Sequence, residues 1–322
     1  ARLARLSVPQ SDVGSVESLL DRAPGNVPEV DLEVDNFELK GRKLGKLTVD
    51  AVNRSRSGVA AAGEWRLNRL TLGLPEAELV ATGQWGAAGG SDGRRRMGLN
   101  FHLQIRDAGA LLQHLGFGAV IRGGKGELNG EVAWGGSPLG LDLPSLSGRM
   151  SLALDAGQFL KADAGAGRLL GVLSLQALPR RLALDFRDVF QEGFAFDNIT
   201  GDLKIAQGVA TTNNLRMRGV QAAALMEGSA DIVRETQNLH VLVVPEINAG
   251  TASLAYAVIN PLVGLGTFLG QLLLRGPLAE AATREFQITG TWSDPQVTPL
   301  LHTPGPAAPA SGASAPRPAS AP

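Results

Sequence analysis

The chain has 322 residues, of which 44% are hydrophobic and 5% aromatic. This length accommodates one large domain or two ordinary ones, and the apolar content is sufficient for a sizeable core. The net charge of -1 gives little long-range attraction for nucleic acid, so we expect no nucleic-acid partner. The absence of cysteine excludes disulfides, thiolate nucleophiles and sulfur metal ligands.

The N-terminal region contains a predicted helix. The first residues, "ARLARLSVPQ", contain neither an initiator methionine nor an apolar signal core, so we expect a mature product or part of a longer protein. The next stretch, "SDVGSVESLLDRA", has helical spacing, with Ser11 or Asp12 as the candidate N-cap.

Alternation of apolar and polar residues is the main signal along the chain. In 99–106, apolar residues occupy every second position, which a strand produces and a helix does not. Similar runs occur at 30–35, 46–51, 150–155, 181–186, 202–205, 239–244 and 285–292. Clusters such as "GGSDG", "RGGKGELNG", "FDNITGD" and "TTNN" are interpreted as the turns between them. The pattern predicts a mainly β fold, an antiparallel meander with one apolar and one polar face.

Helical spacing interrupts this alternation at two further places. In 107–117, Asp107 is the expected N-cap and Gly116 lies near the expected end, with a leucine stripe between them. In 165–190, a leucine-rich helix over 166–178 is followed, after Pro179, by alternating strand residues.

Residues 247–274 contain no Asp, Glu, Lys, Arg or His. This length is sufficient to span a bilayer. Pro261 and several glycines favour two short helices instead, broken near Asn260, that are buried or touch a membrane. The last residues, 303–322, are mostly Pro, Ala, Ser and Gly and predict a disordered tail.

Three tryptophans occur in related contexts. "ATGQWG" and "ITGTWSD" share a spacing of glycine and tryptophan, and "LNGEVAWGG" is a looser relative. We interpret each as a strand bent at its glycine, with Trp85, Trp134 and Trp292 as packing anchors. A ligand-stacking role is the alternative.

The search for catalytic residues yields no convincing constellation. The histidines, His102, His114, His240 and His302, form no close pair in sequence, and we interpret them as solvated. The glycine runs "GKGELNG", "GAGRLLG" and "GLGTFLG" are one residue longer than a dinucleotide loop. The basic run 94–96 is interpreted as a solvated hairpin tip. We therefore predict no catalytic residue, no cofactor and no metal site.

The sequence resembles a known family. The stretch from "GAGRLLGVLSLQALPRRLALDF" through "LHVLVVPEINAG" to "FQITGTWSDPQV" is similar to the C-terminal part of the YhdP family of AsmA-like proteins, continuously over about 165–297. Residues 30–160, including "VIRGGKGELNGEVAWGGSP", resemble the preceding part of that family more loosely.

This resemblance implies a fold, a location and a role. It implies a long curved sheet forming a taco-shaped apolar trough, with a few short helices over its C-terminal end. It implies the C-terminal part of a periplasmic protein of a Gram-negative bacterium, anchored in the inner membrane, that carries phospholipids to the outer membrane without being an enzyme. We accordingly divide the chain into a β-rich groove segment (1–164), a segment with a helix–strand cap and helix pair (165–302) and the tail (303–322).

On this interpretation we assign three groups of residues. The apolar lining of the groove is predicted to include Leu99, Phe101, Leu103, Ile105, Leu152, Leu154, Leu182, Leu184, Phe186, Val241 and Val243. Candidates for head-group contact are Arg168, Arg180 and Arg181. Helix residues expected to face a membrane or a partner, either the outer membrane or one of its proteins, are Leu254, Leu262, Leu265, Phe268, Leu269 and Leu272.

Other readings of the same residues stay open. The apolar strand phase is equally compatible with an ordinary core between sheet and helices. A structural or assembly factor for the outer-membrane envelope would share the β-rich character without conducting lipid. A polysaccharide-acting enzyme would require Asp185, Asp188 and Glu192 to converge in a cleft.

Overall fold

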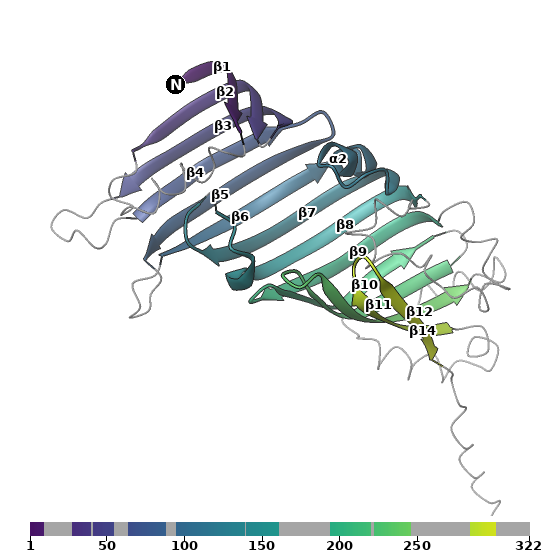
Figure 1. Ribbon diagram of the computed structural model, residues 1–322. Coiled ribbons are helices and arrows are strands. Elements are labelled where there is room, and N and C mark those ends of the chain that lie inside the picture. The colour runs from purple at the N-terminus through teal and green to yellow at the C-terminus, as the bar shows by residue number, and fades with distance from the viewer. Residues whose placement is uncertain are drawn as a thin grey trace, which may run out of the picture.

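The computed structural model describes residues 1–9, 28–39, 41–54, 64–87, 95–138, 140–160, 194–219, 222–245 and 284–300. The described strands form one 14-stranded sheet, whose spatial order is the order of the sequence (Figure 1). The first two strands pair in parallel, and each later neighbouring pair is antiparallel. The predicted mainly β fold with a long antiparallel sheet is confirmed.

The strands of this sheet are β1 (Arg2–Val8), β2 (Val30–Leu39), β3 (Arg42–Arg54), β4 (Glu64–Gly73), β5 (Ala77–Ala87), β6 (Arg95–Ile105), β7 (Ile121–Gly135), β8 (Ser147–Phe159), β9 (Phe194–Ala206), β10 (Val209–Arg218), β11 (Ala222–Asp231), β12 (Thr236–Pro245), β13 (Arg284–Thr291) and β14 (Pro295–Leu300). The helical elements described are α2 (Ala108–His114) and the short 3-10 turn η2 (Leu143–Ser145).

Most strand predictions that fall on described residues agree with these bounds. The runs at 30–35, 46–51, 99–106, 150–155, 202–205, 239–244 and 285–292 lie in β2, β3, β6, β8, β9, β12 and β13, within one residue at their ends. The predicted helices at 11–23, 166–178 and 247–274, the strand at 181–186 and the tail 303–322 lie outside the described residues.

Three predicted turn clusters are wrong, because they lie inside strands. "RGGKGELNG" belongs to β7, "FDNITGD" to β9 and "TTNN" to β10. The polar residues of β9 and β10 are stabilised by cross-strand hydrogen bonds, since Asn198 donates to Asp155 at 2.7 Å and Asn214 donates to Asp202 at 2.7 Å. A turn composition therefore coexists with strand structure where polar side chains bond across the sheet.

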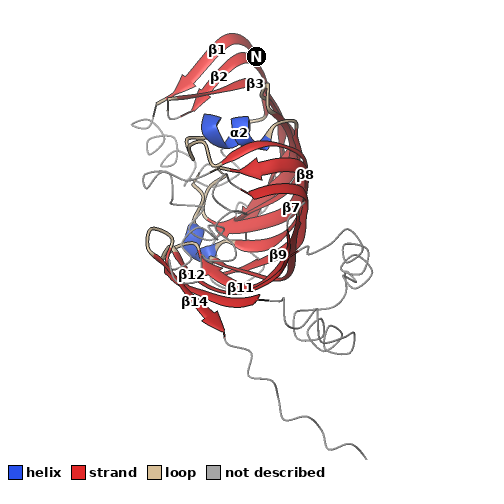
Figure 2. Cartoon of the chain, turned by 90° about the vertical axis from the view of Figure 1, so that its right-hand side faces the viewer, coloured by secondary structure: helices blue, strands red, loops and turns tan. Residues whose placement is uncertain are grey.

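The sheet is curved, and its two faces differ in chemistry. Figure 2 shows the strands bending around α2, which lies on the concave side. The apolar residues Ile105, Leu111 of α2 and Leu154 belong to one buried cluster, so the concave face is the apolar phase of the strands. The opposite, convex phase carries mainly polar and charged residues.

Glycines on the concave face mark where the curved strands crowd together. A Cβ atom at Gly83, Gly126, Gly148 or Gly228 would fall well inside van der Waals contact with a backbone carbonyl of the neighbouring strand. On the convex face the space is larger, because a Cβ at Gly73 or Gly98 would lie 3.9 Å from its nearest neighbour. The absence of side chains at the concave positions permits the curvature.

Helix α2 packs on one rim of the concave face. The Asp107 side chain accepts a hydrogen bond from the Ala110 N–H at 2.9 Å, which confirms the predicted N-cap. The helix ends in a Schellman motif at Gly116 (φ 82°), with the Phe117 N–H donating to the Leu112 carbonyl at 2.9 Å. Its buried residues, Ala108, Gly109 and Leu111, face the sheet.

Large buried side chains pack at the opposite rim. Trp65, Trp85, Met97 and Trp134 are cross-strand neighbours on β4, β5, β6 and β7. The Nε1 groups of Trp85 and Trp134 donate to the carbonyls of Gly136 and Ser137 at 2.7 and 2.9 Å. These tryptophans and Trp292 are all buried, as expected for packing anchors.

Strands β11 and β12 depart from the simple alternation. Leu225 and Leu242, on the convex phase, are 6% and 0% exposed. At this end of the sheet, apolar residues are therefore buried on both faces. Within the described segments, no helix has both the length and the apolar character needed to cross a membrane.

Candidate functional site

A continuous row of apolar residues crosses the entire sheet on its concave face. Cross-strand pairing joins each member to the next, except between β9 and β10, where the register shifts. There, a Cβ on Gly201 would lie 2.8 Å from the Leu215 Cα, so the row remains continuous. We call this row the lane: Leu3, Val34, Leu47, Leu72, Leu79, Leu103, Leu128, Leu152, Gly201, Leu215, Met226, Val241, Phe286 and Pro299.

The lane extends across all fourteen strands without a polar side chain. With neighbouring strands about 4.8 Å apart, the row follows the curved sheet for roughly 60 Å. A second row beside it, from Val49 through Phe101 and Leu239 to Val297, is apolar apart from Thr212. The concave face therefore provides an apolar surface wider than one side chain.

The accessibility of the lane changes along the sheet. Its members on β4 to β8, together with Leu215 on β10, are half-buried. Its members on β11 to β13, Met226, Val241 and Phe286, are 4%, 0% and 4% exposed. On the N-terminal side, Val34 on β2 and Leu47 on β3 are 0% and 7% exposed. The half-buried part of the lane thus lies over the middle of the sheet, and the row is buried on β2, β3 and β11 to β13.

The structure places the predicted lining residues that it describes on the concave face. Leu99, Phe101, Leu103 and Leu152 are half-buried there. Ile105 and Leu154 are buried in the cluster that includes α2, and Val241 and Val243 are buried in the same cluster. The other predicted lining residues, Leu182, Leu184 and Phe186, lie outside the described residues, as do Arg168, Arg180, Arg181 and the residues chosen within 247–274.

Sequence reasoning missed several members of the lane. Leu72 and Leu79 flank a β4–β5 turn in "LTLGLPEAELV", and Leu128 is the apolar member of "GELNGEV". Alternation was present at both places. The glycines of β7 concealed it, because they replace apolar side chains on the crowded concave face.

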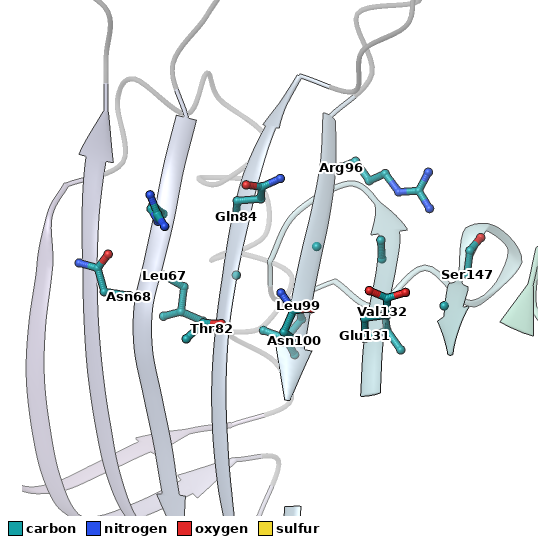
Figure 3. A pocket seen from close by; sticks show the side chains of 15 residues that line it. Leu67, Asn68, Thr82, Gln84, Arg96, Leu99, Asn100, Glu131, Val132 and Ser147 are labelled. Atoms are coloured by element: carbon teal, nitrogen blue, oxygen red, sulfur yellow. The ribbon is translucent and has the colours of Figure 1, made fainter. Parts of the chain in front are cut away.

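The convex face carries a polar network and two open depressions. One depression, of about 560 Å³, is lined by polar residues that include Asn68, Gln84, Arg96 and Glu131, and by the apolar residues Leu67, Leu99 and Val132 (Figure 3). A second, of about 700 Å³, shares Asn100 and Glu131 with it and includes Arg149 and Asp202. These polar side chains alternate with the lane residues along each strand, so the depressions lie on the opposite face from the lane.

Charges on the convex face are paired across strands. Glu33 lies 2.6 Å from the Lys46 Nζ and 3.4 Å from the Arg2 Nε. A hydrogen bond from Lys46 and its positive charge hold the pKa of the Glu33 carboxyl below its usual range. Both side chains of the Glu33–Lys46 pair are exposed, so this ion pair contributes little to stability.

The described histidines occupy separate positions. His102 pairs with Asn129 on the convex face, and the His114 Nδ1 lies 3.3 Å from Glu76 at the end of α2. His240 lies 3.4 Å from Glu285 and is only partly exposed, unlike the solvated histidine expected from the sequence. Among the residues that the structure describes, no three His, Asp or Glu side chains gather closely enough to hold a metal ion.

Comparison with known proteins identifies the family. The protein-family model described as "YhdP protein" matches residues 1–297. The chain belongs to the YhdP family. It is 33% identical over 282 residues to a protein of Escherichia coli (strain K12) named "Intermembrane phospholipid transporter YhdP".

That alignment covers 86% of this chain but 21% of the E. coli protein, so the chain spans about a fifth of its relative's length. No solved structure matches the chain. The YhdP match begins before β1 and ends within β14, and it therefore includes almost the whole sheet and every lane residue but Pro299.

Proposed function

We propose that this chain forms part of a bridge-like carrier that moves phospholipids along the concave face of its sheet. The observation that carries the proposal is the lane, an apolar row that continues across every described strand without a polar side chain. The name of the E. coli relative, an intermembrane phospholipid transporter, supports the same role.

An apolar lane addresses the main barrier to moving a phospholipid through water. Exposing a buried methylene to water costs about 0.8 kcal/mol, so two acyl chains of about sixteen carbons would cost on the order of 25 kcal/mol. A surface that keeps the acyl chains covered at every step lowers this barrier. Because the lane is apolar throughout, it also presents no charged group whose desolvation would create a local barrier.

This role requires binding rather than bond making or breaking. The proposal is therefore a carrier and not an enzyme. The acyl chains would lie on the half-buried residues in the middle of the lane. The head groups would stay in water, on the side of the lipid that faces away from the sheet. Leu99, Phe101, Leu103 and Leu152 would contact the acyl chains directly. Ile105 and Leu154 would support this surface from beneath α2.

The cellular setting is part of the proposal. The chain would act in the periplasm of a Gram-negative bacterium, within a protein anchored in the inner membrane, and transfer phospholipid between inner and outer membranes. The end of the sheet at β14 would lie nearer to the outer membrane or to one of its proteins. The intermembrane role named for the E. coli relative supports this arrangement.

Site-specific photo-crosslinking tests the proposal. A photoreactive amino acid is placed at Leu103 or Leu152 in the lane, or at the adjacent convex positions His102 or Ser151 as matched controls. The purified full chain is incubated with phospholipid vesicles, irradiated and analysed by mass spectrometry. We expect phospholipid adducts from the two lane positions and few from the convex positions.

The outcome separates a carrier from a structural factor. Equal labelling of both faces, or no adduct from either lane position in a folded protein, would contradict lipid binding on the lane. Native mass spectrometry of the unmodified chain provides an independent measurement, in which bound phospholipid should survive gentle desolvation.

A further inference from the structure

The free edge of the last described strand has an unusual composition. β14 pairs with β13 on one side and has no described strand on the other. Its six residues, "PQVTPL", include prolines at Pro295 and Pro299. Proline lacks a backbone N–H and cannot donate to a neighbouring strand.

The pairing with β13 fixes the direction of each backbone group in β14. Pro295, Val297 and Pro299 face Gly290, Ile288 and Phe286, and the register has no bulge. In an antiparallel pair, hydrogen-bonded and non-hydrogen-bonded positions alternate. Because proline cannot occupy a donating position, these three residues are the non-hydrogen-bonded set, and their backbone groups point away from β13.

The outward donors of β14 are therefore almost all missing. Of the three outward-pointing residues, only Val297 retains an N–H group. Two copies of β14 pairing antiparallel about Val297 would oppose Pro295 of one copy to Pro299 of the other. These pairs exchange no hydrogen bond, so the added strand would be held only at Val297.

The other edge of the sheet lacks this feature. β1, "RLARLSV", contains no proline, and all of its residues retain a backbone donor. Exposed sheet edges are sites of unintended strand pairing, and edge prolines are one of the devices that prevent it. The two edges of this sheet thus differ in their capacity to accept a strand.

We propose that Pro295 and Pro299 close the β14 edge to strand addition, so that a second chain cannot extend the sheet there by backbone pairing. The inference does not depend on the proposed lipid-carrier function. The alternative is that the prolines only fill space on the concave face, where they oppose Gly290 and Phe286.

Restoring the missing donors tests this inference. The double variant Pro295→Val, Pro299→Val keeps both side chains apolar, introduces residues of high β propensity and adds the two N–H groups. Because the native chain contains no cysteine, Thr298→Cys provides a single attachment point for pyrene on the exposed side of β14. Pyrene excimer fluorescence then reports pairing of two β14 strands at increasing concentrations of the full chain.

We expect the excimer signal to appear in the Pro→Val double variant, with self-association through β14 about tenfold or more tighter than in the native background. The matched control is Pro75→Val, Pro144→Val, which replaces two exposed prolines away from the edge. Hydrogen exchange at the Gln296 and Thr298 amides establishes that β14 remains paired with β13. An unchanged excimer signal in the double variant, or an equally strong signal in the native background, would overturn the inference.

Discussion

At the scale of single residues, the convex face carries paired charges opposite the apolar concave face. Its charges are compensated by neighbours on adjacent strands, as in the contacts of Glu33 with Lys46 and of Arg106 with Glu78 at 3.1 Å. Such exposed pairs contribute little to stability but keep the surface hydrated. Glu33 is the member of this set whose pKa is lowered by its partner.

The Glu33–Lys46 pair predicts a small pH dependence. Because the folded-state pKa of Glu33 lies below its value in an unfolded chain, the pair stabilises the fold above the ordinary carboxyl range. This contribution is lost as the pH falls through the lowered pKa. Lys46→Gln should raise the pKa of Glu33 toward its usual range, as measured by an NMR titration. Lys125→Gln, on β7, is the control, and an unchanged Glu33 titration in Lys46→Gln would contradict the assignment.

Concave and convex glycines should differ sharply in their tolerance of a methyl group. At Gly126, an added Cβ would overlap the Ala153 carbonyl of the adjacent strand, whereas at Gly98 the nearest atom would be 3.9 Å away. We expect Gly126→Ala to lower the free energy of unfolding by about 1–3 kcal/mol through overpacking. Gly98→Ala should change it by less than about 1 kcal/mol. Urea denaturation of the two variants measures the difference, and equal midpoints would argue against crowding on the concave face.

At the scale of elements, α2 is capped at its N-terminus and is attached to β3 at its C-terminus. Asp107 caps its N-terminus, and at its C-terminus the His114 ring nitrogen Nε2 contacts the Lys43 carbonyl at 2.5 Å. The Arg42 guanidinium donates to the His114 carbonyl at 3.3 Å, where a positive charge complements the helix dipole. Because α2 lies in the chain between β6 and β7, these contacts join that segment to β3.

The N-cap of α2 gives a prediction at this scale. Asp107→Ala should destabilise the protein by about 0.5–2 kcal/mol, because the Ala110 N–H loses its acceptor. Asp107→Asn should retain most of the stability, since asparagine also caps helices. Thermal unfolding and hydrogen exchange of the Ala110 amide provide the measurements. Native protection of that amide in Asp107→Ala would show that the cap does not hold the helix.

The elements differ in how far the sequence reveals them. The alternation over 99–105 identifies β6, and Asp107 with Gly116 identifies α2, because local chemistry determines both. The glycines of β7 predict turns from the sequence, but they lie inside the strand. They permit a curvature that arises only when β6, β7 and β8 pack together. The lane itself depends on the register shift in β10 between Thr212 and Leu215, which brings Leu215 into line with Gly201 on β9 and Met226 on β11. The spacing of apolar residues along one strand does not reveal which residues of the neighbouring strand they face.

At the scale of the whole molecule, the order of the strands converts a local pattern into a continuous surface. Each hairpin joins the apolar phase of one strand to that of the next, so the lane grows by one residue per strand. The lane is therefore long in one direction, and the second row, from Val49 to Val297, runs beside it. A ligand that moves along its half-buried part passes the members from Leu72 on β4 to Leu215 on β10 in turn.

This series arrangement predicts how lane substitutions combine. A carboxylate at Leu72, Leu128 or Leu215 would place a charge in the path of the acyl chains, and we expect Leu72→Asp, Leu128→Asp or Leu215→Asp each to slow lipid transfer about tenfold or more. Because one barrier limits passage along a single path, the Leu72→Asp, Leu215→Asp double variant should be little slower than its slower parent. Independent binding sites would instead give effects that multiply.

Transfer of fluorescent phospholipid between donor and acceptor vesicles, measured with the full chain, distinguishes the two cases. Thr71→Asp and Asn129→Asp, which place the same charge on the convex face next to Leu72 and Leu128, are the matched controls and should transfer lipid at the native rate. A multiplicative loss in the double variant would contradict a single continuous path, and equal losses in the convex controls would contradict a role for the concave face. Native rates in all three lane variants would contradict lipid movement along the lane, because a charge desolvated in an acyl path carries a substantial free-energy cost.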